Sequence, residues 1–443
     1  MARRASTLLL GLLAAQGCTC GSKSSASRDD GVGAPTALAS GATASPLSPP
    51  ADTASFSAPI AAARLGGSDV VAGLVATAGV IRVMGMTGGT IAWTTDALRD
   101  VAWAPDAELR MQAAGAGIAL LWRGPHGGKI GRTLVLLGPH GEAREQPVPV
   151  GSAFCATGAG VAWLDARTTG AAHVLARGWA EASPRPVAVV GSDRDPALVC
   201  GDHDVFVLGD GDDDLTAAAV RPGEPAARPA AVALRDADFG EDEEREHDAY
   251  TVGDDLGLVR VGASGAISLR EIPQGAGPTP WRTLRHTIPA DDDVVAVDGD
   301  ADATVVVYTE DADAACPGAG ATAESVHALR VVRKTGDESV LDLAPPDCDH
   351  APGPFWIAAS PSGPTTLAWV ERRMRPSGAS APVTGAALRV LGPAGVQAKR
   401  LDQAADALVD AGCDERGCSL AALVRPRDGD GMQPGSIRVL AYP

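Results

Sequence analysis

A short apolar segment flanked by turn residues recurs through most of this chain, and the recurrence limits the folds open to it. Six copies read GAGIALLWRG (115–124), GAGVAWLDAR (158–167), DHDVFVLGDG (202–211), ADATVVVYTE (301–310), GPTTLAWVER (363–372) and RGCSLAALVR (416–425). The first three begin 43 and 44 residues apart, and later copies, counted with a weaker one at DDLGLVRVGA (254–263), are spaced by about 50–60 residues. A third apolar run follows most copies, as in RTLVLLGPHGE (132–142), and a weaker fourth closes several units, as in RPVAVVG (185–191).

Four short strands in each unit of 40–60 residues predict an all-β chain folded as a β-propeller with blades of four antiparallel strands. No amphipathic stretch of helical length follows the N-terminus. We count eight blades, with seven as the alternative if 55–107 holds fewer strands. The last unit has only three strands and ends with SIRVLAYP (436–443). SFSAPIAAARL (55–65) is therefore the expected fourth strand of that last blade, and it would close the ring without free edges.

The N-terminus has the pattern of an export signal. Arg3 and Arg4 precede an apolar run at 8–15, which ends in Ala15-Gln16-Gly17-Cys18. This ending resembles the lipobox of bacterial lipoproteins, in which the Cys is lipidated and becomes the mature N-terminus. The resemblance implies a signal peptide at 1–17 and a lipid on Cys18, which anchors the protein without spanning the membrane. Thr19, rather than Asp, after the Cys implies the outer membrane; the alternative is an ordinary cleaved signal and a secreted protein.

Residues 18–54 are dominated by Ser, Ala, Thr, Gly and Pro and show no apolar periodicity. We interpret them as a flexible tether, with a mean reach of about 35 Å, between the lipid and a domain at 55–443. A lipobox followed by a tether and a repeat domain resembles the secreted bacterial β-propeller lipoproteins. No WD40, kelch or Asp-box signature assigns the chain to a subfamily.

Six of the eight cysteines lie in the repeat domain, and disulfides are expected in an exported chain. Cys413 and Cys418 flank a tight turn, and Cys316 and Cys348 fall in connections on one face of the same blade. Cys155 and Cys200 end the first strands of neighbouring blades, which leaves them as the third pair. Buried free thiols are the alternative for all six.

The formal net charge of −18 argues against nucleic acid as a partner, since a phosphate binder needs a basic surface. No apolar stretch of about 20 residues is present, so a spanning helix is not expected. Asp298, Asp300 and Asp302 alternate as at the start of a calcium loop, but the Gly and the final Glu of that loop are missing. Solvated turns are the favoured interpretation of these three residues, and a weak calcium site is the alternative.

No catalytic or cofactor-binding constellation is visible, and we expect a monomer without a cofactor. The eight histidines are scattered singly, and no G-x-S-x-G elbow occurs. Trp93, Trp122, Trp163 and Trp369 fall inside strands and are expected to pack between blades.

The favoured function is therefore a non-catalytic propeller at the cell envelope that presents a face to a protein or a glycan. One alternative is a scaffold lipoprotein of an outer-membrane assembly. Another is a metal-dependent hydrolase or lactonase, which would need carboxylates such as Asp202, Asp255, Asp300 and Asp414 to converge in the channel.

Overall fold

The computed structural model describes strands throughout and no helix in the residues it covers, so none of them could cross a membrane as a helix. The residues described are 56–143, 147–165, 172–190, 197–210, 214–224, 232–235, 244–274, 277–289, 292–315, 322–348, 350–358, 365–373, 383–392, 395–401, 409–414, 417–424 and 436–442. Cys18, the signal peptide and the tether lie outside them.

The first half of the chain forms three sheets in which consecutive strands pair antiparallel. A four-stranded sheet holds β1 (Ser57–Leu65), β2 (Ser68–Val75), β3 (Val80–Thr87) and β4 (Thr90–Arg99). A seven-stranded sheet holds β5 (Glu108–Ala114), β6 (Gly117–His126), β7 (Lys129–Leu137), β8 (Val148–Ala156), β9 (Gly160–Asp165), β10 (Ala172–Gly178) and β11 (Arg185–Val190). The third holds β12 (Ala197–Cys200), β13 (Val205–Asp210), β14 (Asp214–Val220) and β15 (Val232–Arg235).

The second half repeats the same meander in four further sheets. They are β16 (Glu244–Val252), β17 (Asp255–Gly262), β18 (Ala266–Ile272) and β19 (Arg282–Thr287); β20 (Val294–Gly299), β21 (Ala303–Ala315), β22 (Thr322–Val332) and β23 (Glu338–Asp347); β24 (His350–Ala358), β25 (Thr365–Arg373), β26 (Val383–Gly392) and β27 (Gly395–Leu401); and β28 (Val409–Asp414), β29 (Gly417–Val424) and β30 (Ser436–Tyr442).

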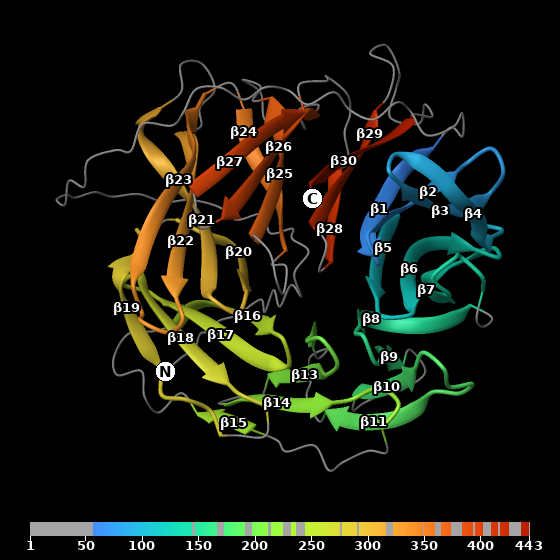
Figure 1. Cartoon of the computed structure of the whole chain (residues 1–443), viewed down its shortest axis with the longest axis horizontal. Coiled ribbons are helices and arrows are strands. Elements are labelled where there is room, and N and C mark those ends of the chain that lie inside the picture. Colours follow the sequence, from blue (N-terminus) through green and yellow to red (C-terminus); the bar gives the residue numbers. More distant parts are fainter. Residues whose placement is uncertain are drawn as a thin grey trace, which may run out of the picture.

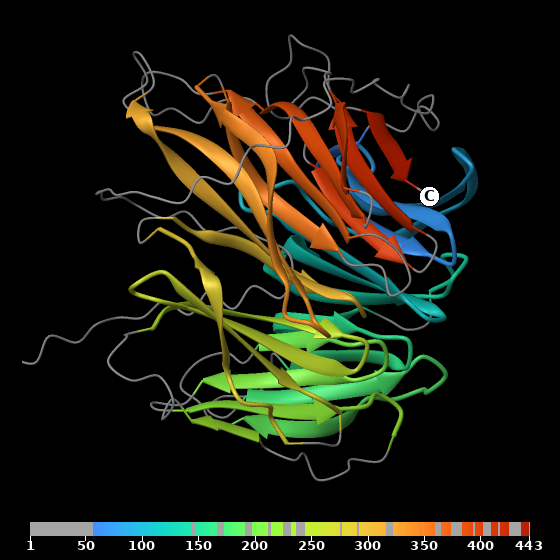
Figure 2. The same cartoon turned by 60° about the vertical axis from the view of Figure 1, so that its left-hand side comes forward.

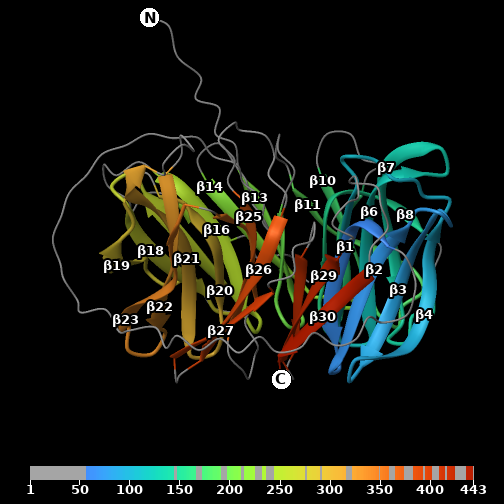
Figure 3. The same ribbon diagram turned by 90° about the horizontal axis from the view of Figure 1, so that it is seen from above.

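The sheets follow one another around a common centre, as Figure 1 shows in colour order from blue to red. The first strands of the sheets, together with β8 from the middle of the seven-stranded sheet, contact each other in the order β1, β5, β8, β12, β16, β20, β24 and β28, and β28 contacts β1 again. Figure 2 shows the twist of each sheet, and Figure 3 shows the strands running between the two faces of the ring. The predicted all-β, propeller-like arrangement is therefore confirmed.

Strand β8 explains why one sheet has seven strands. Its start pairs with β7 through Val148 and Pro149, and its end pairs with β9 through Phe154 to Ala156. The register shifts between Val150 and Phe154, so a bulge lets one strand serve two neighbouring units.

The predicted closure of the ring was wrong. Residues 57–65 form β1, which pairs with β2 as the innermost strand of the first sheet, and β30 has only β29 as its partner among the described strands. The two-residue turn Gly66-Gly67, with φ of 58° and 81°, suits the tight hairpin that joins β1 to β2. The first and last sheets meet through apolar contacts, in a cluster that joins Phe56 and Ile60 to Ala421.

Apolar packing between neighbouring sheets forms the core. Most of the clusters combine side chains from two adjacent sheets, as Leu109 and Trp122 do with Ile81 of the first sheet, and one lies within the seven-stranded sheet. The prediction that tryptophans pack there is confirmed, because Trp122, Trp163 and Trp369 are 0–3% exposed. Trp93 is partly buried and packs against the same cluster as Trp122.

Candidate functional site

The turns that join first to second strands touch one another across neighbouring sheets. The Gly158 N–H donates to the Asp202 carbonyl oxygen at 2.7 Å, and the Asp202 N–H donates to that of Gly253 at 2.9 Å. These contacts link turns 157–160, 201–204 and 253–254, which we call the turn face. Three loops from separate units thus form one continuous hydrogen-bonded surface.

Glycine makes this close approach possible. A Cβ atom on Gly201 would lie 2.5 Å from the Gly253 carbonyl oxygen, and one on Gly158 would lie 2.9 Å from that of Asp202. Both distances are shorter than a Cβ atom tolerates, so a side chain would push neighbouring turns apart.

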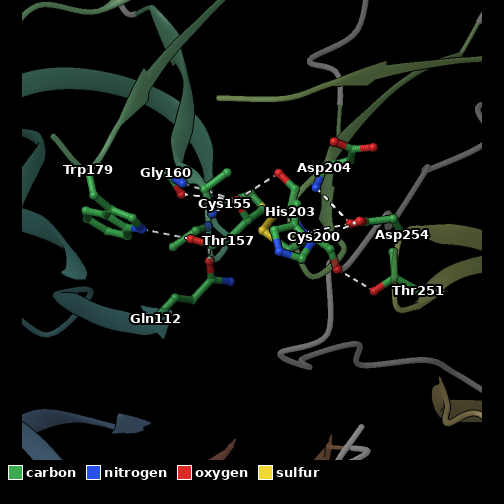
Figure 4. Close-up of a disulfide and its surroundings, with 12 residues drawn as sticks. Gln112, Cys155, Thr157, Gly160, Trp179, Cys200, His203, Asp204, Thr251 and Asp254 are labelled. Carbon is green, nitrogen blue, oxygen red and sulfur yellow. Dashed lines mark hydrogen bonds and ion pairs between the residues drawn. A yellow bond between two sulfur atoms is a disulfide. The ribbon is translucent and has the colours of Figure 1, made fainter. Parts of the chain in front are cut away.

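A disulfide fixes two of the sheets just below the turn face. Cys155 at the end of β8 bonds to Cys200 at the end of β12, with their Cα atoms 5.8 Å apart. The pairing expected from the sequence is therefore confirmed. Figure 4 shows that the hydroxyl of Thr251, on the next first strand, donates to the Cys200 carbonyl oxygen. The bridge and this hydrogen bond tie together three consecutive first strands.

Asp254 is the main acceptor of the turn face. Its Oδ1 accepts from the N–H groups of His203 at 2.6 Å and Asp204 at 3.0 Å, and its Oδ2 lies 3.1 Å from His203 Nδ1 (Figure 4). Burial raises the pKa of the Asp254 carboxyl, but the two N–H groups and the imidazole outweigh that effect, so the pKa lies below its ordinary value. Asp254 is thus held as a carboxylate between two turns.

Arg221 and Gln274 extend the network outward. Arg221 Nε donates to Asp204 Oδ1 at 2.6 Å, and Gln274 Nε2 donates to Asp204 Oδ2 at 2.5 Å. The Gln274 N–H also donates to Asp255 Oδ1 at 2.8 Å. The hydrogen bond to Asp204 raises the pKa of the Arg221 guanidinium, which therefore stays charged. The buried Asp204 carboxylate has a donor on each oxygen, as a buried charge requires.

Trp179 contacts turn 157–160 of the turn face. Its indole N–H donates to the Thr157 carbonyl oxygen at 2.9 Å (Figure 4), and its ring lies against Gly117. The Thr157 hydroxyl donates to the His203 carbonyl oxygen at 3.1 Å. These contacts fix turn 157–160 from both sides.

The carboxylates singled out in the sequence belong to turns and strand ends of different sheets. Asp202 and Asp255 lie on or beside the turn face, Asp300 lies in the β20–β21 turn, and Asp414 ends β28. Desolvation and the nearby Asp254 carboxylate raise the pKa of Asp202, while His203 opposes them. In the part of the chain that the structure covers, no group of three His, Cys, Asp or Glu side chains is placed to hold a metal ion.

The three calcium candidates have local roles in one hairpin. Asp300 Oδ1 accepts from the N–H groups of Asp302 at 2.7 Å and Ala303 at 2.8 Å, and Asp298 Oδ1 accepts from that of Gly299 at 2.9 Å. Asp302 is exposed. Such side-chain to backbone bonds are those of an Asx turn.

The remaining cysteines are placed in part. Cys348, just after β23, is disulfide-bonded, and Cys316 lies outside the described residues. Cys413 and Cys418 face each other as register partners on β28 and β29. Their bridge remains a prediction, with the backbone positions it needs.

Sequence reasoning missed the residues that join the turns. His203 was interpreted as a single loop residue, and Arg221, Asp254 and Gln274 were not singled out. They come from two neighbouring units, and Asp204 contacts Asp254 and Gln274 over 50 and 70 positions of sequence. The recurrence of Asp at equivalent turns (202, 254 and 300) is the sequence signal that could have indicated this surface.

Comparisons with known proteins establish the fold alone. No protein-family model matches the sequence, and no curated protein matches it. A solved prolyl endopeptidase is similar in structure, with a TM-score of 0.52 and 14% identity over 85% of this chain. This chain covers 54% of that protein, so it spans about half its length.

Two weaker likenesses are to shorter proteins. The β-propeller domain of the trilobed protease from Pyrococcus furiosus has a TM-score of 0.46 and 9% identity, over 76% of this chain and 97% of that one. The BP39L lectin from Burkholderia pseudomallei has a TM-score of 0.44 and 13% identity, over 78% and 98%.

Proposed function

We propose that this chain is an envelope-anchored, eight-bladed β-propeller that binds a protein or a glycan through its turn face. The observation that carries the proposal is the hydrogen-bonded network that fixes polar side chains of separate units on that face. A surface whose donors and acceptors are already ordered loses less conformational entropy when a partner binds.

Several groups combine a fixed position with exposure. The His203 ring is held by Asp254 yet is 58% exposed, and Glu224 is 63% exposed beside Arg221. Asp202 is also exposed. Among the described residues of this face named above, the carboxylates of Asp202, Asp204, Asp254 and Glu224 outnumber the cation of Arg221, which favours a partner rich in hydroxyl groups or positive charge.

The path of the chain supports an outward orientation for the turn face. Ser57 at the start of β1 pairs with Leu74 near the end of β2, far from the Gly66-Gly67 turn. Residue 56 therefore enters the ring on the side opposite the turns between first and second strands. A lipid on Cys18 and a tether at 18–54 would leave the turn face directed away from the bilayer.

The strand order supports the proposed count of eight blades. The start of β8 completes the β5–β7 unit, and its remainder begins the next unit, so the seven-stranded sheet counts as two blades. The β28–β30 sheet counts as a three-stranded last blade.

The binding test uses two matched surface variants. His203→Ala with Glu224→Ala changes the turn face, whereas Lys129→Ala changes the β6–β7 turn on the opposite face. Binding to a glycan array and to purified envelope proteins would be measured for both. We expect the turn-face variant to weaken binding at least tenfold and Lys129→Ala to leave it unchanged. Equal binding by both variants would refute the assigned face.

Anchoring has its own test. Cells expressing the full chain would be grown with a labelled fatty acid, and the label should appear on the protein and vanish in Cys18→Ser. Label that persists in Cys18→Ser, or no label on either protein, would refute the lipid anchor without bearing on the binding face.

A further inference from the structure

A serine, a histidine and an aspartate form a hydrogen-bonded chain on the β20–β23 sheet, away from the turn-face network. Ser325 and His327 lie two positions apart on β22 and so share one face of the strand. Ser325 Oγ lies 2.7 Å from His327 Nε2, and His327 Nδ1 lies 3.0 Å from Asp342 Oδ1. Asp342 is the register partner of His327 on β23.

The two ring nitrogens have different partners, and this assigns the protons. A carboxylate only accepts, so Nδ1 of His327 carries the hydrogen that Asp342 receives. In the neutral ring Nε2 is then an acceptor, 2.7 Å from the Ser325 hydroxyl and 3.5 Å from Glu310 Oε2. The hydroxyl has a second acceptor, the Glu310 carbonyl oxygen at 3.2 Å, so rotation about its C–O bond directs its single proton to one or the other. A serine hydroxyl within hydrogen-bond reach of a carboxylate-oriented imidazole has the arrangement of an activated nucleophile.

Packing holds the imidazole in place. The Tyr308 ring stacks on it with centroids 5.3 Å apart and an interplanar angle of 23°. Tyr308 is buried, and its hydroxyl lies 2.9 Å from Nε2 of His286 on the neighbouring sheet. The His286 N–H donates to Glu338 Oε2 at 2.9 Å. His327 is thus packed against Tyr308, and Tyr308 is itself held by His286 of the neighbouring sheet.

The strand pairing is irregular at the serine itself. Glu324 pairs with Asp347, Val326 with Ala344 and His327 with Asp342, so the register shifts twice around Ser325. Bulges of this kind re-aim side chains and are over-represented next to active sites.

We propose that Ser325 is a nucleophile for ester substrates, with His327 as its general base and Asp342 as the residue that orients the imidazole. Ser325 Oγ attacks the ester carbonyl carbon while its proton passes to His327 Nε2. The bond to the leaving alcohol then breaks, and His327 returns the proton to the departing oxygen. Water hydrolyses the acyl-serine by the same proton path, so ester and water give acid and alcohol.

Exposure and charge define the class of ester. Ser325 is 6% exposed, while the side chains of Asp342 and Glu310 beside it are 60% and 46% exposed. Low exposure of the serine favours a small ester, and the carboxylates beside it favour an uncharged or cationic ester over an anionic one. This activity does not depend on the binding function proposed above.

The test is labelling of the folded wild-type protein with a small, neutral fluorophosphonate, followed by peptide mapping. Ser268 on β18 is the matched control, since it is a buried serine on the third strand of its sheet and its hydroxyl lies 3.1 Å from Thr283 Oγ1. We expect labelling of Ser325 at least 100-fold faster than of Ser268.

Variants then separate chemistry from structure. His327→Gln should slow labelling of Ser325 about 100-fold, and Ser325→Ala should abolish hydrolysis of p-nitrophenyl acetate, while Ser268→Ala keeps both. Ser325 that stays unlabelled in the folded wild type, or reacts no faster than Ser268, would overturn the proposal. A labelling rate unchanged in His327→Gln would overturn it as well.

Discussion

The bridge between Cys155 and Cys200 should contribute a large share of the stability that holds the β8–β11 and β12–β15 units together. The two residues are 45 positions apart in the sequence. In the chain-entropy description, a cross-link that closes a loop of this length stabilises the folded state by about 4 kcal/mol at 25 °C. The structure adds a local reason, because the bond lies between adjacent first strands and beneath the turn 201–204.

Replacing both residues by Ala therefore gives a defined expectation. The free energy of unfolding should fall by about 4 kcal/mol. For a domain of about 390 residues the unfolding entropy is about 0.8 kcal/mol per kelvin, so the melting temperature should fall by about 5 °C. Urea titration followed by circular dichroism measures the first quantity, and calorimetry measures the second.

Two controls isolate the bond. Cys155→Ala alone also breaks it and should agree with the double variant within about 1 kcal/mol, whereas Cys20→Ala in the predicted tether should have no effect. A loss below about 1 kcal/mol in the double variant would refute the argument. It would mean that packing of the first strands and the Thr251 hydrogen bond hold the two units without the cross-link.

Other contacts give further expected outcomes. Gly201→Ala should cost about 1–3 kcal/mol of unfolding free energy because its Cβ would meet the Gly253 carbonyl, whereas Gly277→Ala, with open space around it, should cost less than about 1 kcal/mol. The pKa of the Asp254 carboxyl is lower in the folded protein than in the unfolded chain, so the carboxylate stabilises the fold above the unfolded-state pKa. This contribution is lost as the pH falls through the folded-state pKa. The variant Asp254→Asn should therefore lose less stability on acidification than the wild type, as a plot of unfolding free energy against pH would show. Burial raises the pKa of Tyr250 to about 12, so stability should fall as the pH rises from about 10 to 12, and Tyr250→Phe should remove that part of the fall in alkaline urea titrations. Asp300→Asn keeps an oxygen that accepts from the two N–H groups, so it should leave the unfolding free energy nearly unchanged, both with calcium and with a chelator. Asp300→Ala removes that acceptor and should lower the unfolding free energy by about 1 kcal/mol under both conditions. A difference in melting temperature between wild type and Asp300→Asn that occurs only with calcium would instead support a calcium site.

The local sequence predicted much of the fold because strand pairing inside each sheet is local. Short apolar runs separated by Gly and Asp turns pair with the next run along the chain, as the hairpin of β12 and β13 does around 201–204. Burial of Trp122, Trp163 and Trp369 followed from the same pattern, because both faces of such a strand are covered. The Cys155–Cys200 pair was predictable because its members hold equivalent positions in neighbouring units.

The place of residues 57–65 was not predictable from apolar character alone. An innermost strand and an outer closing strand can have the same composition. The small side chains of Ala61, Ala62 and Ala63, all under 4% exposed, fit the crowded position between β5 and β28. The Gly66-Gly67 turn is the local sequence signal that predicts a hairpin between residues 57–65 and β2, and hence a first strand of the first sheet rather than a closing strand of the last one.

The sequence by itself therefore determined the repeating strands, the meander within each sheet, the buried tryptophans and one disulfide, because these depend on periodicity and on neighbours along the chain. Only the tertiary structure decided how the ring closes, that Asp254 meets His203 and Arg221, and that Ser325, His327 and Asp342 form one hydrogen-bonded chain. Those arrangements depend on how neighbouring sheets pack and on where bulges shift the register, since a shift of one residue reverses the face to which a side chain belongs.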